Sequence, residues 1–155
     1  MSATTELTSV KREVAIAASP ETVWELLVDP EKAVRWMGTA ATFEVRPGGL
    51  YRVDVVPGNS AVGKFVEIDR PRRLVYTWGW ESGPGSSVPP GSTTVEFDLI
   101  PQDSGTLLRF RHSGLPSSKS AESHGHGWDH YFERLAAVAT GEDPGPDPWV
   151  AEPPQ

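Results

Sequence analysis

Four histidines are the residues of this sequence best suited to acid–base or metal chemistry near neutral pH. His126 and His130 are four positions apart, and this spacing puts two imidazoles on one helix face, where they could bind a metal. No third ligand is evident nearby, and the surrounding apolar pattern puts both side chains on the face toward solvent. We therefore predict no metal site and no cofactor.

The other two histidines, His112 and His124, are expected to point toward the interior. His124 shares an apolar helical stripe with Trp128 and Tyr131, and His112 follows Phe110 on one face of a strand. Two interpretations stay open: each histidine is a buried polar group paired with backbone or water, or each contacts a ligand and transfers protons. No residue is assigned a catalytic role.

The chain has six tryptophans, and their positions suggest a pocket. Trp78 and Trp80 are expected on the same inward face of one strand, which is more aromatic bulk than packing alone needs in a domain of this size. For any single aromatic residue, simple filling of the core is the alternative. The predicted ligand-binding residues are Phe65, Tyr76, Trp78, Trp80, His112, His124, Trp128 and Tyr131.

Composition excludes several other kinds of site. The chain of 155 residues has no cysteine, which rules out disulfides, Cys-based zinc sites and Cys nucleophiles, and no serine stands in a G-x-S-x-G frame. A formal net charge of −7 without a basic stripe argues against nucleic-acid binding. No apolar run is long enough to span a membrane, so we expect a cytoplasmic protein without membrane insertion.

Periodicity and end signals predict the elements that must position these side chains. Ser19-Pro20-Glu21 is typical of a helix start, Asp29-Pro30 of a helix end, and Gly141 of the end of the last helix. The expected elements are a strand (10–16), two short helices (20–28 and 31–36), six strands between 42 and 112, and a long helix (121–140). This order indicates an α+β domain whose strands form an antiparallel meander.

The two ends differ from the middle. Residues 1–6 are expected to be a flexible leader, and residues 7–140 a single domain. Residues 141–155 hold five prolines and four acidic residues with no Lys or Arg, so we predict a disordered or loosely docked tail. Trp149 is the only residue there suited to anchor it.

Several short motifs together resemble one known group of proteins. They are VAI at 14–16 followed by SPETVW at 19–24, RPGG at 46–49, PRRLVYTW at 71–78, and HSGL at 112–115. Their order and spacing resemble START-like (SRPBCC) proteins, and more narrowly the homologues of the C-terminal domain of the activator of Hsp90 ATPase. The resemblance covers roughly residues 8–140.

The resemblance implies a helix-grip fold: a curved antiparallel sheet of seven strands wrapped around a long C-terminal helix, with two short helices after the first strand. A cavity between sheet and helix would then bind a small hydrophobic or aromatic molecule. The alternatives are a metal-free cyclase- or hydratase-like enzyme using pocket His and Tyr residues, and a stress-related interaction module. Direct contact with Hsp90 is not expected, because the co-chaperone's separate N-terminal domain has no counterpart in this chain. Homodimer formation is left open.

Overall fold

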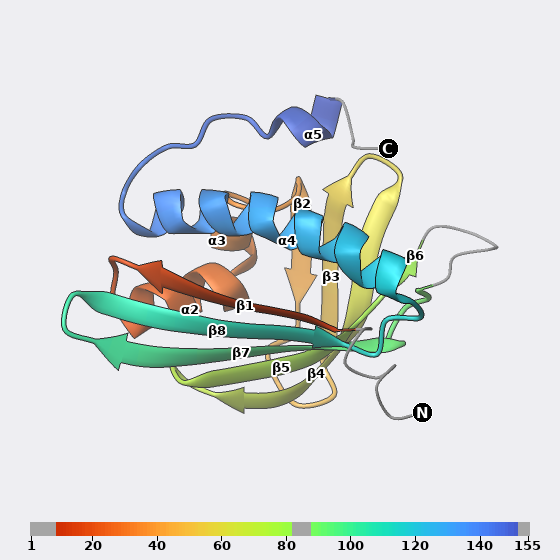
Figure 1. The fold of residues 1–155 in the computed structure, drawn as a ribbon, viewed down its shortest axis with the longest axis horizontal. Coiled ribbons are helices and arrows are strands. Elements are labelled where there is room, and N and C mark those ends of the chain that lie inside the picture. Colours follow the sequence, from red (N-terminus) through yellow and green to blue (C-terminus); the bar gives the residue numbers. More distant parts are fainter. Residues whose placement is uncertain (1–8, 82–87, 152–155) are drawn as a thin grey trace.

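The computed structural model describes residues 9–81 and 88–151. The predicted leader and the last four residues of the predicted tail therefore lie outside the described residues. The described chain is α+β, with one long helix lying over a curved antiparallel sheet (Figure 1). The predicted helix-grip fold is confirmed.

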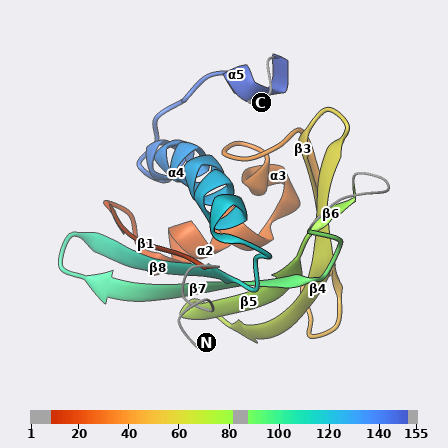
Figure 2. The ribbon, with the colours of Figure 1, turned by 45° about the vertical axis from the view of Figure 1, so that its right-hand side comes forward.

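The sheet is built from eight strands in the order β1-β8-β7-β5-β4-β3-β2, with the short β6 paired to β4. Every pairing is antiparallel. The strands are β1 (Val10–Ile16), β2 (Ala40–Phe43), β3 (Leu50–Val56), β4 (Asn59–Asp69), β5 (Arg73–Trp78), β6 (Trp80–Glu81), β7 (Thr93–Gln102) and β8 (Gly105–Ser113). The sheet curls so that β2 and β3 rise beside the helix, while β1, β8 and β7 lie beneath it (Figures 1 and 2).

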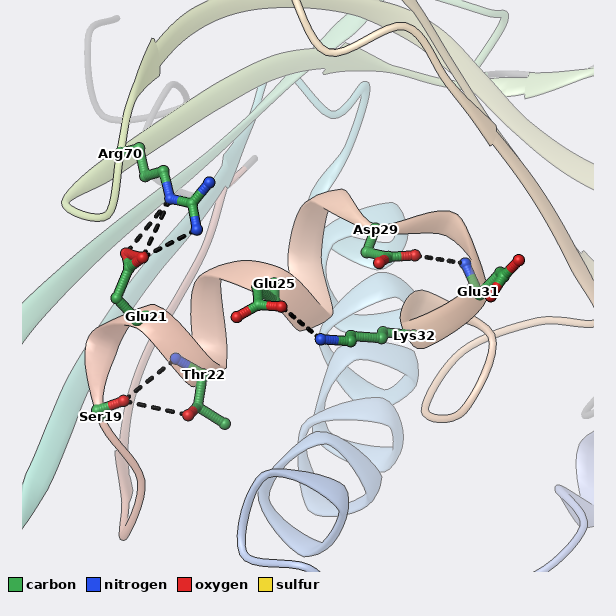
Figure 3. Close-up of polar contacts among 8 residues, drawn as sticks. All are labelled: Ser19, Glu21, Thr22, Glu25, Asp29, Glu31, Lys32 and Arg70. Carbon is green, nitrogen blue, oxygen red and sulfur yellow. Dashed lines mark hydrogen bonds and ion pairs between the residues drawn. The ribbon is translucent and has the colours of Figure 1, made fainter.

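Two short helices, α2 (Pro20–Val28) and α3 (Pro30–Ala33), follow β1. α2 has the predicted bounds, whereas α3 starts one residue earlier and ends three residues earlier than the expected 31–36. The Ser19 hydroxyl accepts the N–H of Thr22 at 3.2 Å, and the Asp29 carboxylate accepts the N–H of Glu31 at 2.9 Å (Figure 3). Because Asp29 both ends α2 and caps α3, the chain turns sharply there. α2 buries Trp24 and its aliphatic neighbours against the sheet.

The long helix α4 (Ser118–Ala139) carries one face of the site. It begins at Ser117, whose hydroxyl accepts the N–H of Ser120. It ends at Gly141, which has a φ of +88°, and the N–H of Glu142 bonds back to the carbonyl of Ala137 at 2.9 Å. This Schellman-type end requires a residue that tolerates positive φ, which is why the helix stops where glycine stands.

The prediction of a single strand through Trp78 and Trp80 is wrong. Strand β5 ends at Trp78, Gly79 belongs to no strand, and β6 begins at Trp80. A Cβ on Gly79 would lie 1.7 Å from the carbonyl oxygen of Pro89, so backbone from the following segment occupies that space. Trp80 then starts β6 opposite Ala61 of β4. The first strand of the meander, β2, starts at Ala40, two residues before the range of 42 to 112 expected for these strands.

Beyond α4, residues 141–151 run back over the helix and end in the single turn α5 (Pro148–Ala151), which lies above α4 on the β3 side (Figures 1 and 2). The boundary predicted at residue 140, between the domain and the tail, stays a prediction. Within the described ranges, no helix is both long enough and apolar enough to cross a membrane.

Candidate functional site

A cavity of about 320 Å³ lies between α4, β3 and the end of β5. This volume is within the range of small-molecule sites, roughly 300–1,000 Å³. Its lining consists of Met37, Val55, Val56, Asn59, Trp78, Trp80, Ser123, His124, Gly127, Trp128, Tyr131 and Trp149. None of these residues carries a permanent charge, and four of them are tryptophans.

Trp78 stands at the centre of the aromatic wall. It is 3% exposed, and its ring meets Trp80 at a centroid distance of 4.7 Å and Trp128 at 5.9 Å. The imidazoles of His112 and His124 pack edge-on against it at 4.8 and 5.5 Å. Strand β5, the short β6, β8 and α4 therefore all contribute rings to one cluster.

His112 is fully buried behind this wall and makes hydrogen bonds with both ring nitrogens. The Trp128 indole N–H donates to Nδ1 at 3.1 Å, and because an indole can only donate, the imidazole proton resides on Nε2. Nε2 then donates to the Thr93 hydroxyl at 2.8 Å, which in turn donates to the Trp78 carbonyl at 2.6 Å. His112 is thus a neutral link between α4, β8 and β7.

His124 has the opposite tautomer. The Trp80 indole N–H donates to its Nε2 at 3.0 Å, so the proton lies on Nδ1, which donates to the Ser120 carbonyl at 2.8 Å. This contact joins α4 to β6 across the mouth of the cavity. It also explains why Trp80 lies at the site although it does not continue strand β5.

Burial keeps both histidines uncharged. Desolvation, reinforced by the neighbouring His124, lowers the pKa of His112 to about 3. Desolvation also lowers the pKa of His124, against the opposing effect of its bond to Ser120. Neither imidazole has a ring nitrogen free for proton transfer. The arrangement is therefore suited to shape and hydrogen-bond recognition.

Two polar groups of the cavity-lining residues have no partner within the described part of the chain. They are Nε1 of Trp78 and the hydroxyl of Tyr131, both buried. Burial raises the pKa of Tyr131, and the negative charge of Asp147 adds to this effect. The hydroxyl therefore stays protonated and can donate. A buried donor without an acceptor costs about 1–3 kcal/mol.

The structure brings five of the eight predicted site residues to the cavity: Trp78, Trp80, His124, Trp128 and Tyr131. His112 lies directly behind them. Phe65 and Tyr76 lie elsewhere in the core, where Tyr76 stacks on Tyr51 at 4.0 Å and meets Phe65 edge-on at 6.0 Å. The alternation of inward and outward residues along the strands predicted correctly that both side chains are buried. It could not distinguish residues that fill the core from residues that line the cavity.

Sequence reasoning missed the contribution of β3 and of the tail. Val55 and Val56 line the cavity because β3 rises beside α4, which depends on sheet curvature. Trp149 lines it because the tail returns over α4. The sequence pointed to this residue only as the one suited to anchor the tail.

The expectation that His130 faces solvent is wrong. Its imidazole stacks on Trp149 at 3.7 Å and donates from Nε2 to the Asp147 carboxylate at 2.9 Å. His126 is exposed and lies 5.6 Å from the same indole. In the described ranges, no group of three or more potential ligands could hold a metal ion.

Comparison with known proteins agrees with this architecture. An AHSA1-like protein from Rhizobium etli, solved in solution by NMR, is 53% identical, with a TM-score of 0.72 over 91% of this chain and 87% of that one. DynU16, a protein of the dynemicin biosynthetic locus, is 27% identical, with a TM-score of 0.73 over 88% of this chain and 49% of that one.

A curated relative from Schizosaccharomyces pombe, described as uncharacterized protein C1711.08, is 25% identical over 138 residues. These are 89% of this chain but 39% of the relative, so the chain spans about two fifths of that protein's length. The family model for activator of Hsp90 ATPase homolog 1-like proteins matches residues 17–140. The chain therefore belongs to the activator of Hsp90 ATPase homolog 1-like family.

Proposed function

We propose that this protein binds a small, uncharged and largely aromatic molecule in the cavity between α4 and the sheet. The observation that carries the proposal is the cavity lining, in which indole rings dominate and no residue is permanently charged. The fold of the family commonly binds hydrophobic ligands, which supports the proposal.

The unpartnered groups suggest the polarity of the ligand. Trp78 Nε1 and the Tyr131 hydroxyl can each donate a hydrogen bond, whereas the nitrogens of His124 are already engaged. A planar molecule with a carbonyl or ether oxygen would satisfy such donors while its rings contact the indoles. An anion would have to be desolvated without a cation in the lining, which is costly.

The two alternative functions have less support. An enzyme using His112 or His124 as acid or base needs a ring nitrogen free to exchange protons, and each nitrogen already has a partner. An interaction module acting through its surface would not require a pocket between helix and sheet. The pocket beside α4 therefore favours ligand binding over the interaction module, and the engaged histidines favour it over the enzyme.

Gly127 offers a sharp test, because it lines the cavity from α4 and a Cβ there would meet nothing within 4 Å. The probe is N-phenyl-1-naphthylamine, an uncharged aromatic amine that fluoresces in apolar sites. We expect saturable binding to the wild-type protein. Gly127→Leu should abolish that binding by filling the space, while stability is kept because leucine favours helix over glycine.

The matched control is Glu122→Leu, which adds the same side chain on the exposed face of α4. It should bind the probe like the wild type. The proposal fails if Gly127→Leu binds as tightly as the wild-type protein, or if the wild-type protein shows no saturable binding.

A further inference from the structure

Trp149 belongs to a segment that follows the part of the chain matched by the family model. The family match ends at residue 140, yet Trp149 is one of the residues lining the cavity. Its indole lies flat on His130 at 3.7 Å and 13°, and edge-on to Tyr131 at 5.6 Å. One ring therefore contacts a cavity-lining residue of α4 while covering the helix from outside.

A small set of contacts holds this segment in place. Asp147 Oδ1 accepts two hydrogen bonds, from the Trp149 backbone N–H at 3.0 Å and from His130 Nε2 at 2.9 Å. Further back, Arg134 of α4 donates to the Gly145 carbonyl at 2.9 Å. Gly145 has a φ of +75°, and the chain changes direction there before it reaches Asp147.

The attachment is incompletely satisfied where it meets the cavity wall. The Asp147 side chain is 6% exposed, and its Oδ2 has no partner within the described ranges. The Tyr131 hydroxyl is likewise unpartnered, and it is near enough for the charge of Asp147 to raise the pKa of Tyr131. A buried carboxylate oxygen without a donor is unfavourable, and this weakens the closed arrangement.

We propose that residues 141–151 form a strap that closes the cavity, with Trp149 as a ligand-contacting wall and the Asp147–His130 pair as its latch. This inference rests on the proposed function, since it assigns the strap to the same cavity. The strap would sit on the path by which a ligand leaves, between α4 and β3. Its release should therefore govern the rate of dissociation more than that of association.

The first measurement needs no ligand. The protein is labelled with 5-fluorotryptophan, and the ¹⁹F resonance of Trp149 is identified by its absence from Trp149→Phe. Because Trp149 is half-buried when docked, a soluble gadolinium chelate should broaden this resonance markedly less in the wild-type protein than in Asp147→Ala. Glu142→Ala removes a carboxylate from the same segment without touching the latch, and it should behave like the wild type.

The second measurement is stopped-flow dissociation of N-phenyl-1-naphthylamine. Trp149→Ala and Asp147→Ala should each release the probe roughly tenfold faster than the wild-type protein, with a smaller change in association, and Glu142→Ala should not. Unchanged dissociation in both variants, with wild-type binding intact, would overturn the strap.

Failure of the strap and failure of the binding function give different results. A Trp149 resonance that the chelate broadens equally in the wild-type protein and in Asp147→Ala overturns the strap whatever the probe does. Probe binding that is absent from the wild-type protein, beside a protected Trp149 resonance, contradicts the binding function and leaves the strap without its role at the cavity.

Discussion

Two indole N–H groups decide the protonation of the two interior histidines. Trp128 donates to Nδ1 of His112, and Trp80 donates to Nε2 of His124, so the two imidazoles hold their protons on opposite nitrogens. Each remaining nitrogen has an oxygen acceptor. The histidines thus join helix to sheet and define the wall of the cavity without carrying charge.

The buried His112 should make stability depend on pH. Its pKa is about 3 in the fold and near 6.5 in an unfolded chain, so the unfolded state binds the extra proton between these values. The free energy of unfolding should therefore fall as pH drops from about 6.5 toward 3, by up to about 1.4 kcal/mol per pH unit from this group.

His112→Gln isolates this effect, because a glutamine amide can accept from Trp128 and donate to Thr93 without titrating. Urea unfolding at about pH 7 and pH 5 is the measurement. The wild-type protein should lose about 2 kcal/mol more than the variant between the two pH values. His124 titrates in both proteins, so equal losses would show that His112 is not the buried neutral base described.

At the scale of elements, the break between β5 and β6 shapes the site. Gly79 lets the backbone near Pro89 approach closely, and the Trp80 N–H bonds to the Val88 carbonyl at 2.6 Å. Trp80 still lies on the same inward side as Trp78, and from β6 it reaches His124 of α4.

Gly79→Ala should therefore destabilise the protein, by about 1–3 kcal/mol, because the methyl group would collide with backbone that cannot move independently. Gly127→Ala is the control: the same change in open space on a helix should stabilise by roughly 0.5–1 kcal/mol. Chemical denaturation measures both. If Gly79→Ala is as stable as the wild type, the close approach at Pro89 does not constrain the break.

At the scale of the whole molecule, α4 forms one layer and the curved sheet the other (Figure 2). The cavity lies between residues of these two layers. Met37, in the turn that follows α3, and Trp149 of α5 line its sides. A molecule bound there would contact the helix, the sheet and the strap together. Its binding energy should therefore stabilise the folded domain as a unit.

This predicts a thermal shift that depends on probe concentration. At a free N-phenyl-1-naphthylamine concentration 100 times Kd, binding to the native state alone adds about 2.7 kcal/mol. For a domain of this size, the Tm should rise by roughly 5–10 °C in differential scanning fluorimetry at a wavelength free of probe emission. Gly127→Leu should show no shift; an equal shift in that variant would place the probe outside the cavity.

The sequence by itself determined the elements and most of their inward faces. The start at Ser19, the helix end at Asp29-Pro30 and the stop at Gly141 are local signals, and local signals can be read within a few residues of chain. The second role of Asp29, as the cap of α3, was not predicted. Alternation on β5 and β8 and the stripe on α4 likewise placed Tyr76, His112 and Trp128 inside.

The tertiary structure alone decided which interior residues border empty space. Trp80 meets His124 44 positions away, and His130 meets Trp149 because the tail reverses over α4. Such contacts depend on sheet curvature and on the path of the chain, which side-chain periodicity does not encode. The same physical reason separates Phe65 and Tyr76, which fill the core, from the tryptophans that line the cavity.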